Sequence, residues 1–233
     1  MLLCAIYNRP YHIKDIEHLL SLTDSATYYC ALPAVSGTLS NALHDSPKFI
    51  KSISGDPCPV FEAAAKLHHK VLFREALIWV VGNWTEPQIG ELSDRRLRHL
   101  AQYAYGEIST IVSRSVSKII DVGLLGCGPN DWTVGIREGI VYPNHEEQWH
   151  PAELDLCERP QLNLPKFFRN IVDEDNFPEE VRVYELDLTD LLENNLVLSG
   201  KWLIAGKDSV EGYFLCAAIE DEDLPWNPKE TDW

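Results

Sequence analysis

The sequence of 233 residues is long enough to bury a substantial core, in one large domain or two small ones. Its net charge of -16 is unevenly placed, because residues 173–233 hold 17 of the 36 acidic side chains and 4 of the 20 basic ones, a local balance of -13. Phosphate backbones repel such a surface and no basic stripe upstream offsets it, so we expect no direct binding of nucleic acid.

Hydropathy and cysteine spacing bear on the compartment. No stretch approaches the roughly 18 to 20 uninterrupted apolar residues that a membrane-spanning helix needs. The first apolar run, Leu2 to Ile6, is too short for the core of a signal peptide. The six cysteines lie far apart and form no CxxC pair, which favours reduced thiols. We therefore expect no membrane contact and a cytoplasmic or nuclear protein.

The first 45 residues predict a pair of amphipathic helices. Apolar residues recur mostly at three- and four-residue spacings from Ile13 to Tyr29 and again from Leu32 to Leu43. Pro33 suits the first turn of the second helix, where its missing N–H costs nothing. Asp45, Ser46 and Pro47 then end that helix.

Further helices follow the turn at Gly55-Asp56-Pro57. The same periodicity predicts helices over residues 60–67 and 71–81, with His68 and His69 in the tight connection between them and Gly82-Asn83 at the end. The longest periodic stretch runs from about Leu92 to Val122, and Ser93 or Asp94 can cap its start.

The last hundred residues are less regular. Residues 123–165 are rich in Gly, Pro, Trp and charge and predict a long loop or small irregular subdomain. A helix at Leu186 to Asn194 and a strand at Tyr213 to Ile219 are expected, the strand as part of a small antiparallel hairpin or sheet packed on helices. The predicted fold class is therefore mainly α, with helical hairpins and a small β element near the C-terminus, an α+β arrangement.

Three segments carry a family resemblance. Leu2 to Tyr11 and the two helices after it resemble the last strand and final two helices of a BTB/POZ domain. Ala63 to Leu77 resembles the BACK-like helical region that follows BTB domains in many fungal proteins. Tyr213 to Trp226, with Thr231-Asp232-Trp233, is similar to the C-terminal signature of those same proteins.

The resemblance implies residues 1–54 as the C-terminal part of a BTB domain, 55–122 as a BACK-like region and 123–233 as an irregular region with a C-terminal helix, a β-hairpin and an acidic tail. It also implies a non-catalytic protein-interaction module, with a cullin scaffold of a ubiquitin ligase as one candidate partner. The N-terminal half of the BTB domain, which makes the usual family dimer, is missing from this sequence. A truncated product without robust function therefore stays open as an alternative.

A second alternative is enzymatic. The run from Ile119 to Gly128 looks like the strand and glycine loop of an S-adenosylmethionine-dependent methyltransferase, with Gly123–Gly128 as the cofactor loop. The helical period continues through the preceding residues, which favours a helix that the glycines end. We therefore expect no bound cofactor.

Other chemistry-bearing residues lack an organising motif. The metal-capable side chains His145, Glu146, Glu147, His150, Glu153, Asp155 and Cys157 show no HExxH or paired CxxC spacing, so we expect no metal site. No GxSxG, phosphate-binding loop or kinase signature is present, and no nucleophile stands out.

The acidic tail supplies the candidate interaction residues: Asp221, Glu222, Asp223, Trp226 and Trp233. Each indole can bury on the order of 150 to 250 Å² and is costly to leave in water. We expect the segment from Leu224 to Trp233 to dock back onto the domain through its tryptophans. The competing hypothesis is a linear motif that is disordered until another protein captures it.

Overall fold

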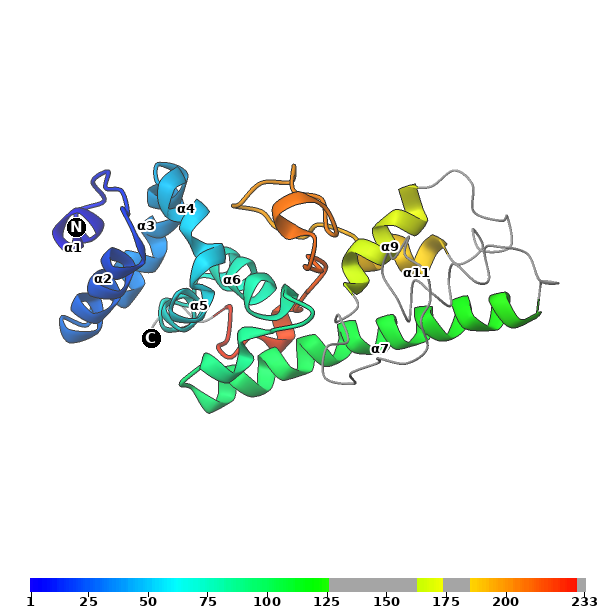
Figure 1. The fold of residues 1–233 in the computed structure, drawn as a ribbon. Helices are drawn as coiled ribbons and strands as arrows, with labels where there is room; N and C mark the ends of the chain where they lie inside the picture. Colours follow the sequence, from blue (N-terminus) through cyan, green and yellow to red (C-terminus); the bar gives the residue numbers. More distant parts are fainter. Residues whose placement is uncertain (126–162, 174–184, 230–233) are drawn as a thin grey trace, which may run out of the picture.

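The computed structural model describes residues 1–125, 163–173 and 185–229, and within these ranges the chain is mainly helical. Helices α1 (Leu2–Ile6), α2 (Ile16–Tyr28), α3 (Leu32–His44) and α4 (Pro47–Ser52) form one end of the molecule (Figure 1). A 3-10 turn, η1 (Ile53–Gly55), leads into the hairpin of α5 (Pro57–Lys66) and α6 (Lys70–Gly82).

The second half is built along one long helix. After the 3-10 turn η2 (Gln88–Glu91), α7 (Arg95–Leu125) runs from near α5 to the end of the molecule opposite α1–α3, and α9 (Leu164–Asp173) and α11 (Glu185–Leu191) lie over its C-terminal half (Figure 1). The 3-10 turns η3 (Asp208–Val210) and η4 (Asp221–Asp223) interrupt an otherwise irregular C-terminal segment.

Local sequence signals explain where these helices begin. Asp15 caps α2, its carboxylate accepting a hydrogen bond from the His18 N–H at 2.9 Å. Asp94 caps α7 in the same way through the Arg96 N–H at 2.7 Å. Side-chain oxygens at this position satisfy N–H groups that the helix itself leaves unpaired.

The apolar faces of the helices meet in a single core. Buried residues from Ala5 in α1 to Leu224 near the C-terminus belong to one hydrophobic cluster. At its centre Phe61 of α5 stacks on Phe73 of α6 with ring centroids 4.4 Å apart, and both side chains are fully buried. The three regions predicted from the sequence thus share one core.

The predicted strand at Tyr213 to Ile219 is wrong. In the described part of the chain no strand forms, and this segment makes one isolated bridge, between Asn83 and Tyr213. Its neighbour, residues 195–199, cannot supply a ladder, because the Glu75 carboxylate accepts the N–H groups of Val197, Leu198 and Ser199. In place of the predicted β-hairpin, residues 195–199 and residues 213–219 are each bound to α6.

Two further expectations need correction. Leu2 to Ile6, which resembled a strand, forms α1, since a short apolar run fits either structure and packing against α2 and α3 decides. Residues 48–54, for which no helix was predicted, belong to α4 and η1. Among the described residues, no helix is long and apolar enough to span a bilayer.

Candidate interaction surfaces

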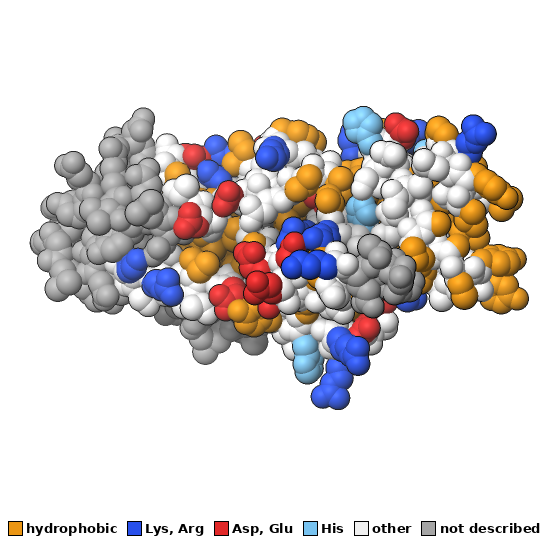
Figure 2. All heavy atoms as spheres, turned by 180° about the vertical axis from the view of Figure 1, so that it is seen from behind, with side chains coloured by type: hydrophobic (Ala, Val, Ile, Leu, Met, Phe, Trp, Pro, Cys, Tyr) orange, Lys and Arg blue, Asp and Glu red, His pale blue; other side chains and the backbone are white. Residues whose placement is uncertain are grey.

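Exposed apolar side chains gather at the N-terminal end of the molecule. Figure 2 shows them at the right-hand edge, which is the end formed by the first helices. They comprise Leu3, Ile6 and Tyr7 from α1 and Tyr28 and Tyr29 from the end of α2, here called the N-terminal apolar face. Tyr28 is 80% exposed, Tyr7 71% and Leu3 69%.

Local structure explains why these side chains point outward. Helix α2 buries Leu19, Leu22 and Ala26 on one side. Tyr28 and Tyr29, at its C-terminal end, lie outside this buried side. Cys30 then adopts a positive φ of 51°, which turns the chain into α3. The two tyrosine rings contact each other edge to face, with centroids 4.9 Å apart, instead of reaching the core.

The C-terminal segment 213–229, here called the strap, lies against α6. Phe214 donates its N–H to the Gly82 carbonyl at 2.9 Å, and a Cβ at Gly82 would lie 2.6 Å from the Phe214 carbonyl oxygen. A glycine is therefore required there for the strap to approach. Arg74 of α6 donates to the Ile219 carbonyl at 3.1 Å.

Asp221 is the charged anchor of the strap. Its carboxylate receives Lys70 at 2.7 Å and Arg74 at 2.9 Å. The hydrogen bond from Lys70 holds the pKa of Asp221 below its usual value. Glu222 and Asp223 are exposed beside it. One of the three predicted acidic residues is thus engaged within the molecule.

Trp226 docks as the sequence predicted. Its indole stacks on His68, with ring centroids 5.1 Å and planes 3° apart, and meets Phe73 edge to face at 4.9 Å. The structure places His68 and His69 in the turn between α5 and α6, where we expected them. Trp233 lies outside the described residues, so the docking is confirmed for Trp226.

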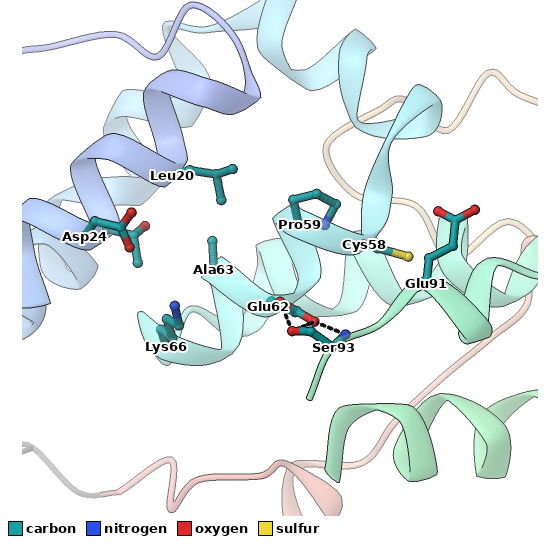
Figure 3. A pocket seen from close by; sticks show the side chains of 10 residues that line it. Leu20, Asp24, Cys58, Pro59, Glu62, Ala63, Lys66, Glu91 and Ser93 are labelled. Carbon is teal, nitrogen blue, oxygen red and sulfur yellow. Dashed lines mark hydrogen bonds between the residues drawn. The ribbon is translucent and has the colours of Figure 1, made fainter. Parts of the chain in front are cut away.

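A pocket of about 190 Å³ opens between α2, α5 and η2 (Figure 3). Asp24, Glu62, Lys66, Glu91 and the Cys58 thiol are among its lining groups. Glu62 is held by Ser93, whose N–H and hydroxyl it accepts at 2.6 and 2.8 Å.

The pocket's thiol is not an activated nucleophile. Burial, together with the nearby carboxylates of Glu91, Asp56 and Glu62, raises the pKa of Cys58 to about 12. Its S–H points to the Gln88 carbonyl at 3.2 Å. A catalytic cysteine needs a lowered pKa, so this chemistry does not fit covalent catalysis.

The segment Ile119 to Leu125, which resembled a methyltransferase strand, belongs to α7. Gly123 is therefore a helical residue, while Gly126, Cys127 and Gly128 lie outside the described residues. The metal-capable stretch from His145 to Cys157 lies outside them as well. Among the residues that the structure describes, no group of three or more potential ligands could hold a metal ion.

Sequence reasoning missed the N-terminal apolar face and Glu75. The periodicity placed Tyr29 on the apolar side of the helix predicted from Ile13, but Tyr29 is 66% exposed at the end of α2. Glu75 is a carboxylate buried to 1% exposure in α6, and no pattern in the sequence distinguishes it from a surface glutamate. The available signal for the apolar face was the pair of adjacent tyrosines, Tyr28 and Tyr29, directly before the break between two helices.

Fold and surfaces together define a mainly helical protein with exposed apolar side chains at its N-terminal end and a C-terminal strap bound to α6. No family model, curated protein or solved structure matches the chain.

Proposed function

We propose that the chain is a non-catalytic protein-interaction module, an adaptor or scaffold of the BTB/BACK-like kind. The observation that carries this proposal is the N-terminal apolar face. Of the large hydrophobic side chains exposed in the described residues, Met1, Leu3, Ile6, Tyr7, Tyr28 and Tyr29 lie within the first 29 residues. Single exposed apolar residues are ordinary, whereas a gathered set marks a binding surface.

The composition of this face also supports binding. Residues 1–8 and 25–43 contain no Lys, Arg, Asp or Glu, although the whole chain carries a charge of -16. The centres of protein interfaces are depleted in charge and enriched in tyrosine. A solvated helical surface with no partner normally carries charged residues instead.

Helical hairpins at the resembling segments support the finer proposal. The pair α2 and α3 and the pair α5 and α6 lie in the segments that resemble BTB and BACK-like helices. By that resemblance a cullin scaffold is a candidate partner, and a cytoplasmic or nuclear location is expected.

The test compares partner capture by the native chain and by variants of the face. Leu3→Asp and Tyr28→Lys place a charge at strongly exposed positions, and each sign suits its end of the helix. Tyr103→Lys on α7 is the control, because Tyr103 is 64% exposed away from the face. In-cell crosslinking and quantitative mass spectrometry should show partners that both face variants lose and the control retains.

A titration with a purified cullin N-terminal region tests the finer proposal directly. Saturable binding that Tyr28→Lys weakens would support the adaptor role. Partner sets that are identical for the native chain and both face variants would refute the proposed function.

A further inference from the structure

We infer that the N-terminal apolar face binds a second copy of this chain, giving a two-fold symmetric dimer. This inference rests on the proposed function and names one partner for the same surface. In such a dimer the same patch occurs on both subunits and must be complementary to itself.

The exposed area of the face matches what a stable dimer needs. Tyr7, Tyr28 and Tyr29 are 71%, 80% and 66% exposed. With roughly 200 Å² for each ring, these fractions leave about 430 Å² of tyrosine surface in water. Leu3 and Ile6 add to this area at 69% and 44% exposure. A standard interface buries about 800 Å² on each partner, of which a little more than half is apolar, or about 450 Å².

Charge favours a second copy at this face over association elsewhere. Two chains of charge -16 repel each other, and residues 173–233 carry -13 of that charge. Residues 1–8 and 25–43, which bear the face, carry no charged side chain. Contact through this surface therefore places no like charges opposite one another at the centre of the interface.

The position of the face fits an end-to-end arrangement. Helices α1–α3 form one end of the molecule, and α9, α11 and the far half of α7 form the other (Figure 1). Two copies joined at the first end keep α9 and α11 at opposite ends of the dimer, while the strap lies against α6 between the two ends. Arg9 directly follows the first uncharged segment and Asp24 directly precedes the second, so charged residues border the face in the sequence, as in the polar rim of an interface.

Analytical ultracentrifugation of the full chain tests the inference. The native protein should sediment at twice its 26.5 kDa mass. Leu3→Asp and Tyr28→Lys should each raise the dimer Kd at least about tenfold, because every dimer then buries two unpaired charges. Tyr103→Lys should sediment like the native protein. Circular dichroism should show that each variant keeps its helical content, so that a weaker dimer is not caused by unfolding.

The results separate this inference from the proposed function. A native chain that remains monomeric at about 100 µM would overturn the dimer. So would a dimer that both face variants leave unchanged, since its interface would lie elsewhere. A monomer whose face variants still lose a captured partner would show that the face binds another protein, so the proposed function would stand while the dimer would not.

Discussion

The indole of Trp226 lies parallel to the imidazole of His68, with ring centroids 5.1 Å and planes 3° apart. This contact joins the strap to the turn between α5 and α6, which lies 158 residues earlier in the sequence, and Phe73 contacts the same indole edge to face. The tail is therefore part of the folded unit as far as Trp226.

Trp226→Ala should lower the free energy of unfolding by about 2 kcal/mol, because it removes the half-buried indole and both of its ring contacts. Urea denaturation measures the change. Trp202→Ala is the matched control, since Trp202 is 72% exposed, and it should cost less than about 0.5 kcal/mol. Equal losses for the two variants would show that the docked tail contributes no stability.

Glu75→Gln should be more damaging than its small change in size indicates. The Glu75 carboxylate accepts N–H groups from Val197, Leu198 and Ser199 at 2.6 to 3.0 Å, and it is 1% exposed. A glutamine amide would direct its own donors at one of these N–H groups. We expect a loss of about 2 to 4 kcal/mol in the free energy of unfolding.

Glu62→Gln is the matched control for Glu75. Glu62 also accepts backbone N–H groups, from Ser93 and Asp94, but at an exposed site. Water can replace those bonds, so its loss should stay near or below about 1 kcal/mol. If Glu75→Gln lowers the free energy of unfolding no more than Glu62→Gln does, the buried hydrogen bonds of Glu75 do not stabilise the fold as described.

Stability should fall in mild acid because of His69. The His69 Nδ1 accepts the Leu72 N–H at 3.2 Å and caps α6, which leaves Nε2 to donate to Ser40 at 2.9 Å. Burial lowers the pKa of His69 to about 4 from an ordinary 6.5. The unfolded chain therefore takes up a proton first as the pH falls.

This contribution is complete above pH 6.5 and is lost as the pH falls toward about 4, where the loss reaches about 3 kcal/mol. His69→Asn keeps a capping acceptor and removes the titration. Urea midpoints measured across this range should fall less steeply for that variant than for the native chain. Parallel curves would show that His69 does not titrate as described.

Cysteine reactivity should follow burial. Burial raises the pKa of both Cys58 and Cys216 to about 12, while Cys30 is exposed at the turn into α3. At about pH 8, iodoacetamide should modify Cys30 at least about tenfold faster than Cys58 or Cys216. Peptide mapping follows each site, and labelling in urea should equalise the rates. Rapid native labelling of Cys58 would show that its pocket opens.

Sequence periodicity predicted the main helices because helix formation depends on spacing and caps that lie within a few residues. The helices expected at 13–29, 32–43, 60–67, 71–81 and 92–122 appear as α2, α3, α5, α6 and α7. Asp94, one of two expected caps, holds the start of α7, whereas Ser93 binds Glu62.

A strand cannot be predicted in the same local way, because its hydrogen bonds come from another segment. The apolar run at Tyr213 to Ile219 predicted a strand, but its neighbour gives three N–H groups to Glu75 instead. Leu2 to Ile6 resembled a strand for a related reason, since a short apolar run does not fix its own conformation.

The candidate surfaces also depend partly on the local sequence and partly on tertiary packing. The sequence alone identified Trp226 as a ring that needs a partner and fixed the uneven charge along the chain. Only the tertiary structure decided that His68 and Phe73 cover Trp226 while Tyr28 and Tyr29 stay exposed. The physical reason is that burial depends on which helices pack together, and residues of equal hydrophobicity differ only in what lies opposite them.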